Sequence, residues 1–290
     1  MLIQTAITGL AIGGVYALMA VGYSLVFSIL NFSNFAHGSV IMLGAYAGYF
    51  ILKGIGASFP VALAGSMLVG ALLGCANEWL AYRPLRVRKA KPLYFMISAM
   101  GVSILLENLI YATLGAHFYS YPEILGRGVV RIWGASVGLL DLFALAFSTL
   151  AIYALHLYLQ RTKSGMAIRA ASYDMTVAAV CGVRLDRVVG LVFFIAGALA
   201  GLSGVFLGMK YMAYPTMGWI TNKAYVAAVI GGLGSLPGAV VGGILLGLLE
   251  TFVSVYVSSI IRDVFSFSML VIVLLVLPNG LLGKYVEEKI

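Results

Sequence analysis

The sequence predicts an all-α polytopic membrane protein with about eight transmembrane helices (between about eight and ten). Of its 290 residues, 62% are hydrophobic and only 10% are charged, and the mean hydropathy is +1.05. Ordinary soluble domains are about 25% charged. The apolar residues also form long runs, whereas a membrane β-barrel would show short alternating segments. We therefore interpret residues 1–290 as a single transmembrane domain.

The spans follow one another along the whole chain. By length they are expected near residues 6–30, 39–52, 60–82, 93–114, 137–159, 188–210, 239–258 and 264–277. The first has no basic segment before it and is too long for a signal peptide, so we expect a transmembrane helix. The second is short, which predicts a tilted or broken helix. The 35 glycines suit close packing of helices in lipid.

Basic residues gather in two loops. Ten of the 18 Lys and Arg residues lie in residues 82–92 and 161–187. The positive-inside rule places both loops in the cytoplasm, and five spans before the second loop place the N-terminus outside. Eight spans would leave the C-terminus outside and nine would bring it inside; the charge-balanced tail, residues 284–290, does not decide. Charge concentrated in such loops gives no reason to expect nucleic acid as a partner.

The second basic loop, residues 161–187, is polar and helix-prone in a chain that is otherwise apolar. A protein that only spans a membrane has no need of such a loop, but one that grips a soluble partner does. We therefore expect residues 161–187 to be a cytoplasmic docking loop.

Residues 224–258 are too long for one straight span, because 1.5 Å per residue would give about 50 Å against a hydrocarbon core of about 30 Å. A helix break is expected near the middle, with a half-helix at residues 224–230 before it; a plain extracellular turn is the alternative. Glycine loosens the backbone and proline removes a donor. The residues expected to make the break are Gly231, Gly232, Gly234, Pro237 and Gly238.

A second interruption lies at residues 31–38, where four polar side chains fall between two apolar runs. Asn and Ser side chains compete with helical backbone hydrogen bonds, so a break is expected, either as an interfacial loop or as an unwound strip beside a pathway or gate. Interruptions in both halves of a chain also hint at an inverted repeat. The candidate pathway residues here are Asn31, Asn34, His37 and Gly38.

Ionisable groups inside spans are costly and are candidates for function. Glu107, beside Asn108, and Glu250 lie deepest and have no obvious Lys or Arg partner; each is either a link between helices or a lining of the pathway. Glu78 lies near Arg83, where an interfacial ion pair is an alternative, and Asp141 lies where water can solvate it.

Several chemistries lack a sequence signature. The sequence has no G-x-x-x-x-G-K-[ST] segment to cradle a nucleotide and no H-E-x-x-H or Cys/His spacing for a metal. No G-x-S-x-G elbow is present. Cys75 and Cys181 are interpreted as two reduced thiols. These absences leave an intramembrane enzyme as an alternative that no residue nominates, and we expect no ATPase site, metal or cofactor in this chain.

The order of several motifs resembles the branched-chain amino acid ABC transporter permeases, most of all their H-type subunit. The resemblance covers essentially the whole chain, and the segments that carry it are residues 13–22, 34–38, 82–86, 165–188, 231–239 and 277–283. It implies ABC-importer permease architecture in a bacterial inner membrane. It also implies four partners: a second related permease, two cytoplasmic ATPases and a periplasmic or surface-tethered binding protein.

The resemblance also implies roles for particular residues. Residues 161–187 would hold the coupling helix that seats in the ATPase, and its matching positions are Gly165, Arg169, Ala170, Ala171 and Gly182. Small residues would let the helix seat closely, with Arg169 as an anchor. Ser39 stands where the family usually carries Glu, so the substrate is open: branched-chain amino acids, other amino acids, urea or short amides. A stand-alone secondary carrier is the alternative from another class.

Overall fold

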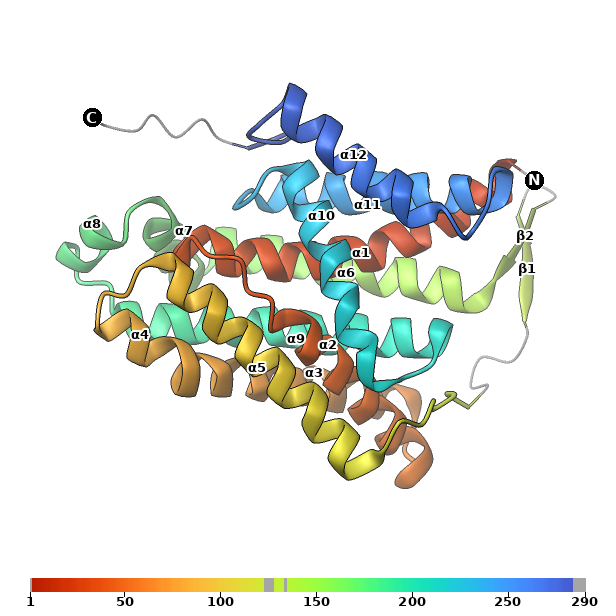
Figure 1. The fold of residues 1–290 in the computed structure, drawn as a ribbon, viewed down its shortest axis with the longest axis horizontal. Coiled ribbons are helices and arrows are strands. Elements are labelled where there is room, and N and C mark those ends of the chain that lie inside the picture. The colour runs from red at the N-terminus through yellow and green to blue at the C-terminus, as the bar shows by residue number, and fades with distance from the viewer. Residues whose placement is uncertain (1, 123–127, 133–134, 284–290) are drawn as a thin grey trace.

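Helices run along almost all of the described chain, which comprises residues 2–122, 128–132 and 135–283 of a computed structural model (Figure 1). The predicted all-α membrane fold is confirmed. Six helical stretches of the described residues are long and apolar enough to cross a membrane. They are α1 (Leu2–Leu30), Phe59–Val87, α5 (Pro92–Leu114), α6 (Leu139–Arg161), α9 (Leu185–Tyr211) and α11 (Leu236–Tyr256). The second joins α3 (Phe59–Asn77), a π-helical segment (Glu78–Tyr82) and α4 (Arg83–Val87).

The two other expected spans form shorter helices. Residues 39–52 lie in α2 (His37–Tyr49) and a π-helical turn (Phe50–Gly54), and residues 264–277 lie in α12 (Arg262–Val276). The 15 residues of α12 extend about 22 Å, less than a hydrocarbon core of about 30 Å. The expected eight spans therefore consist of six long helices and two short ones.

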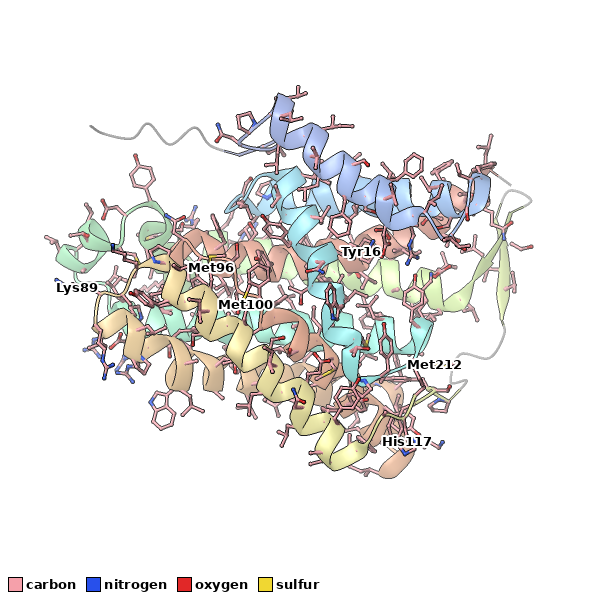
Figure 2. The ribbon with its side chains drawn as sticks, viewed as in Figure 1. Tyr16, Lys89, Met96, Met100, His117 and Met212 are labelled. Atoms are coloured by element: carbon pink, nitrogen blue, oxygen red, sulfur yellow. The ribbon has the colours of Figure 1, made fainter. Side chains whose placement is uncertain are left out.

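The two ends of the molecule differ in charge and in the elements they carry. Lys89 lies at one end and His117 and Met212 at the other (Figure 2). The helices α7 (Lys163–Tyr173) and α8 (Met175–Val180) share the end of Lys89, and the N-terminus lies at the opposite end (Figure 1). The described chain ends beside the turn after residue 231, since Leu282 N donates to Gly231 O. It therefore ends on the side of α7, in agreement with the alternative of nine passages.

Helix α1 is the centre of the bundle. Residues 13–26 are buried without interruption, as expected for a helix that is apolar on all sides. Glycines explain how closely its neighbours approach: a Cβ added to Gly247 of α11 would lie 2.3 Å from the Cα of Gly13. On the other side of the bundle, a Cβ on Gly197 of α9 would lie 2.2 Å from the carbonyl oxygen of Gly70 in α3. The abundance of glycine thus serves helix packing.

The expected half-helix is confirmed and begins earlier than predicted. A 3₁₀ turn, η3 (Pro215–Ile220), leads into α10 (Thr221–Gly231), and α11 follows after a short turn. Within that turn Gly232 and Gly234 have positive φ angles of 110° and 80°, which favour glycine. Pro237 and Gly238 already belong to the first turn of α11, where proline is tolerated.

The turn at residues 231–238 lies at the same end as the basic loops, whereas the alternative, an extracellular turn, is expected at the opposite end. The nearest atom to a Cβ built on Gly234 is the Cα of Ser28, 3.6 Å away, at the last turn of α1. This is the end that carries α7 and the basic loops (Figure 1). The turn lies there because α10 returns through the bundle instead of ending at the far side.

A β-hairpin was not predicted. Strand β1 (Val129–Ile132) pairs antiparallel with β2 (Ala135–Gly138), with Val129 opposite Gly138. The span expected from residue 137 therefore begins at Leu139 instead. The hairpin projects at the end opposite α7 (Figure 1).

Candidate translocation pathway and coupling surface

The first interruption folds as a strip between α1 and α2. Asn31 ends α1 with a positive φ of 53°, a conformation that Asn tolerates. Phe32 and Asn34 are then buried. Tyr82 donates its hydroxyl proton to Asn34 Oδ1 at 2.8 Å, and the ring of Phe32 packs at 5.2 Å from that of Tyr82. Asn31 is exposed, and Ser33 and Phe35 are half-buried, so the strip presents a polar end and buries every second residue after it.

The residues after this strip begin α2 inside the protein. His37 is only 3% exposed, and its ring lies edge-on to Tyr23 with centroids 6.2 Å apart. A Cβ on Gly38 would lie 1.6 Å from Thr221 Oγ1 and 2.1 Å from the carbonyl oxygen of Gly218. The first turn of α2 is thus pressed against η3 and the start of α10.

Ser39 connects this junction to α5. Its hydroxyl oxygen lies 2.7 Å from that of Ser103. Ser39 is buried, Ser103 is half-buried, and Trp219 in η3 is 73% exposed. The structure therefore brings the predicted residues 34–39 together with α5, η3 and α10. The contribution of Ser103, Gly218 and Thr221 was missed, because no local pattern marks a contact between segments so far apart in the sequence.

Glu107 and Asn108 lie at the surface of this chain. Helix α5 is buried only at Phe95, Ala99 and Ile110. Glu107 is half-buried, and exposed Asn108 donates to the carbonyl of Ile104 in its own helix at 2.8 Å. These two side chains are therefore available to a neighbour outside the described chain.

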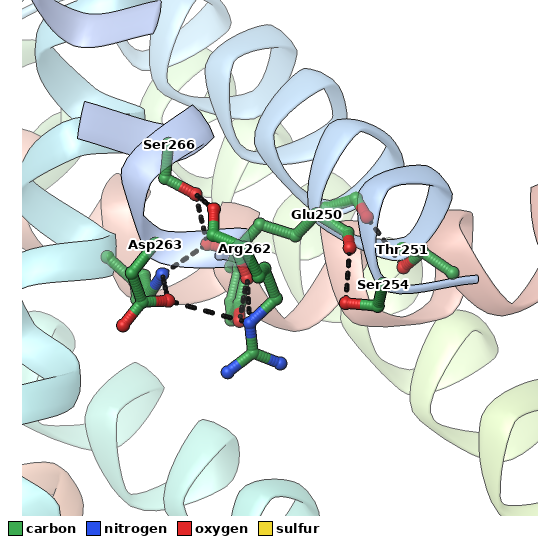
Figure 3. Close-up of polar contacts among 9 residues, drawn as sticks. Glu250, Thr251, Ser254, Arg262, Asp263 and Ser266 are labelled. Atoms are coloured by element: carbon green, nitrogen blue, oxygen red, sulfur yellow. Dashed lines mark hydrogen bonds and ion pairs between the residues drawn. The ribbon is translucent and has the colours of Figure 1, made fainter. Parts of the chain in front are cut away.

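Glu250 is different, and the expectation that it has no basic partner is wrong. It is 2% exposed, and Lys223 Nζ donates to its Oε1. Tyr16 donates to Oε2 at 2.8 Å and Ser266 to Oε1 at 2.7 Å. Figure 3 shows Arg262 and Asp263 beside this carboxylate. The partners escaped prediction because they come from three other helices, α1, α10 and α12, which meet α11 only in the fold.

The other two membrane carboxylates are also paired. Glu78 accepts from Arg86 at 2.6 Å, where Arg83 was the expected neighbour. Asp141 accepts from Lys210 at 2.7 Å, and its side chain is 17% exposed. Half-buried Asp141 therefore has a basic partner in addition to the contact with water that was expected. Buried charges need such partners because isolated charges in a low-dielectric interior are costly.

The predicted coupling loop folds into α7 and α8. Thr162 begins α7 and accepts a hydrogen bond from Gly165 N at 2.9 Å. Asp174 begins α8 and accepts from the backbone N–H of Thr176 and Val177. Such caps satisfy free N–H groups at helix starts. Gly182, with φ of 86°, ends α8 in a left-handed conformation.

The predicted coupling residues divide between two faces. Gly165 and Ala171 are buried against the body of the protein, and a Cβ on Gly165 would lie 2.4 Å from the carbonyl oxygen of Tyr158. Arg169, Ala170 and Gly182 are exposed. The hypothesis that Gly165 and Ala171 seat directly against a partner therefore needs correction: they seat α7 against α6 and the bundle.

The outward face of α7 and α8 carries an apolar surface that sequence reasoning missed. Its large members are Met166, Tyr173, Val177 and Val180, which are 61%, 89%, 58% and 85% exposed. Asp186 anchors the following turn to the first basic loop, through Arg86 at 2.7 Å and Arg83 at 3.3 Å. We call Met166, Tyr173, Val177 and Val180 together the coupling surface. The sequence does contain a signal for this surface, because these apolar residues lie inside an otherwise polar loop.

No group of three or more His, Cys, Asp or Glu side chains that fits a metal ion occurs among the described residues. The side chains that gather here are hydroxyls, amides, paired charges and apolar groups. Such a set can line a path, and together with the six long apolar helices it is typical of a multi-pass membrane permease.

Known proteins agree with this class. The family model described as "Branched-chain amino acid transport system / permease component" matches residues 5–274. The high-affinity branched-chain amino acid transport system permease protein LivH of Salmonella typhimurium is 37% identical, covering 99% of this chain and 97% of its own. BraD of Pseudomonas aeruginosa, a permease of the same description, is 34% identical over 99% of this chain and 98% of its own.

A solved structure supports the fold. An inward-facing putative metal-chelate type ABC transporter superposes with a TM-score of 0.51 at 18% identity, covering 93% of this chain and 85% of that one. The chain belongs to the family of permease components of branched-chain amino acid transport systems. It is a multi-pass transport protein of the inner membrane, and its family is one of transport subunits and not of enzymes.

Proposed function

We propose that this chain forms half of the pathway by which an ATP-driven importer carries branched-chain amino acids across the membrane. A second related permease supplies the other half, and a periplasmic or surface-tethered binding protein delivers the amino acid. Two cytoplasmic P-loop ATPases bind and hydrolyse ATP, so this chain needs no cofactor of its own. Family membership supports this assembly.

The coupling surface is the observation that carries the proposal. Tyr173 and Val180 are almost fully exposed. They end the short helices α7 and α8, which lie at the basic end of the molecule (Figure 1). Exposed apolar patches on the watery side of a protein mark contacts with partners. An ATPase that covers this surface would move α7, and α7 is fixed to α6 through Gly165.

The pathway is assigned to the junction of α2, α5 and η3. The groups that meet there, Ser39, Ser103 and Thr221, carry hydroxyls and no charge. A path of this kind binds an apolar amino acid weakly and lets it leave, while the binding protein supplies selectivity. The exposed surface of α5, which includes Glu107 and Asn108, faces the second permease or the pathway.

Purification and uptake test the assembly and the substrate together. A tagged chain purified from mild-detergent membranes is expected to bring two ATPases and a second permease. In liposomes with the binding protein and ATP, the complex is expected to accumulate leucine, isoleucine and valine. Accumulation of urea or acetamide instead would select the alternative substrates. Uptake by the chain alone, driven by an ion gradient, would overturn the importer and support a secondary carrier.

The coupling surface has its own test. Tyr173→Asp and Val180→Asp place a charge in the proposed contact without touching the interior, so uptake and ATPase co-purification are expected to fall together. Val87→Asp is the control, because Val87 is 71% exposed on α4 outside the coupling surface. Gly165→Trp is expected to uncouple ATP hydrolysis from uptake by pushing α7 off α6. Unchanged uptake in Gly165→Trp would contradict the role of α7.

A further inference from the structure

Helix α10 joins the two regions already described. Its first residue, Thr221, lies against the start of α2 at Gly38. Its last residue, Gly231, precedes the turn at the end of the molecule that carries α7. An 11-residue helix has little stability of its own. Its position must therefore come from contacts with the rest of the protein.

The first contact is electrostatic and lies near the start of α10. Buried Lys223 donates to Asp263 Oδ1 at 2.7 Å and also to Glu250 Oε1. Asp263 and Arg262 open α12, and Arg262 Nε lies 3.7 Å from Glu250 Oε2 (Figure 3). The positive charges of Lys223 and Arg262 thus balance the negative charges of Glu250 and Asp263 where α10, α11 and α12 meet.

The second contact is made by the backbone at the other end of α10. Leu281 N donates to the carbonyl of Ile230 at 2.9 Å, and Leu282 N donates to that of Gly231 at 2.9 Å. These carbonyls belong to the last turn of α10, which leaves its final acceptors free. Gly280, at φ of 75°, permits this approach, because its Cβ would lie 2.5 Å from the backbone of Gly232.

Both contacts come from one continuous segment, residues 262–283. Buried ion pairs add little stability on balance, since apolar groups of the same shape often serve as well. Here the pair joins α12 to α10 directly, because Lys223 Nζ lies 2.7 Å from Asp263 Oδ1. This segment holds α10 by a charge pair at one end and by backbone hydrogen bonds at the other. Together these contacts fix the position of α10 along its axis and its rotation about that axis.

We propose that residues 262–283 act as a clasp that positions α10, so that α10, α11 and α12 move as one unit and carry η3 with them at the pathway. The role in transport rests on the function proposed above. Lys223, Asp263 and Gly280 are positioning residues: they act through α10 on Thr221 and Gly218 and do not touch the substrate.

Charge removal tests the clasp in the assembled importer. Lys223→Met is expected to lower uptake about tenfold or more, because it leaves the buried carboxylate of Glu250 without its hydrogen-bonded cation. Asp263→Asn is expected to have a smaller effect, because the side chain of Asp263 is 58% exposed. The double variant is expected to be no worse than Lys223→Met, since both charges serve one contact. Lys223→Arg, which keeps the cation, is expected to retain most uptake. The control is Lys210→Met, which breaks the Asp141 pair between α9 and α6 and is expected to stay within about threefold.

A cross-link separates positioning from simple stability. In a chain with Cys75→Ala and Cys181→Ser, the pair Lys223→Cys and Asp263→Cys is expected to lose uptake and to regain it when a short flexible bis-methanethiosulfonate joins the two thiols. Recovery supports one moving unit. Uptake that stays lost after complete cross-linking would show that α10 and α12 must move apart, and it would overturn the proposal.

A distance measurement keeps the clasp testable without transport. Spin labels on Trp219→Cys and Val87→Cys report the position of η3 relative to α4 in the purified complex. Lys223→Met is expected to broaden or shift that distance, and Lys210→Met to leave it unchanged. An unchanged distance in Lys223→Met would overturn the clasp, whereas absence of amino acid uptake in the unmodified complex would overturn only the proposed function.

Discussion

The two interruptions of the apolar helices, residues 31–38 and 231–238, are built in different ways. The first is held largely by side chains, with Tyr82 bonded to Asn34 and Ser39 to Ser103. The second is held by backbone against backbone: a Cβ on Gly231 would lie 1.9 Å from the carbonyl oxygen of Gly238. Side-chain contacts can be weakened one at a time, whereas a glycine contact between backbones leaves no room for any other residue.

At Gly38 the first interruption also depends on a close contact between a glycine and neighbouring backbone. Replacement of Gly38 is therefore expected to have the largest effect on uptake. In Gly38→Val the new side chain meets Thr221 and the backbone of Gly218, so α2 and η3 must separate at a cost of about 3 kcal/mol or more. Uptake is expected to fall to background. Gly190→Val is the control, because nothing lies within 4 Å of a Cβ there. Uptake normalised to the amount of protein in the membrane measures both, and normal uptake in Gly38→Val would show that the junction is not part of the pathway.

Substitutions in the second interruption are expected to have the next largest effect. Gly231→Ala places a methyl group against the backbone of Gly238 and is expected to cost about 2 kcal/mol. Gly234→Ala has room for its methyl group, but its φ of 80° costs an L-residue roughly 1 kcal/mol. Thermal unfolding in detergent should rank the two variants in that order. The reverse ranking would mean that backbone conformation, and not close contact, decides this turn.

Tyr82→Phe probes the side-chain contacts of the first interruption. It leaves the rings around Phe32 in place but removes the donor to buried Asn34, and the unmet acceptor is expected to cost about 1–2 kcal/mol. The fall in thermal midpoint is expected to be about 2–4 °C per kcal/mol. Adding Asn34→Leu should recover part of the loss, because both polar partners are then gone. A double variant that is less stable than Tyr82→Phe would contradict the assignment.

Ser39→Ala is expected to have the smallest effect. It removes one hydrogen bond to Ser103, worth about 0.5–1 kcal/mol between membrane helices. Ser203→Ala is matched to it, because the hydroxyl of Ser203 donates to carbonyls of its own helix, those of Leu199 and Ala200. A larger loss of uptake in Ser39→Ala than in Ser203→Ala, at equal thermal midpoints, would assign Ser39 to the pathway. Equal losses would limit Ser39 to packing.

Long apolar runs made the helices predictable, and particular residues show where prediction stopped. Glu107 and Glu250 looked alike in the sequence, but one lies at the surface of α5 and the other inside a set of charges from α10 and α12. Gly165 was predicted to contact a partner and instead contacts α6. For Glu250 the residue and its helix were predicted correctly, but its partners lie on helices that are distant in the sequence or not adjacent to it.

The sequence by itself determined the membrane fold, the order of the helices, the half-helix, the polar loop at residues 161–187 and the family. These follow from local properties: length and apolarity decide what crosses a bilayer, and glycine, proline and basic residues mark turns and sides. Only the tertiary structure decided which charges pair, which face of α7 is exposed and how residues 262–283 hold α10. Those outcomes depend on contacts between segments up to 234 positions apart, as for Tyr16 and Glu250, and no local pattern encodes such contacts.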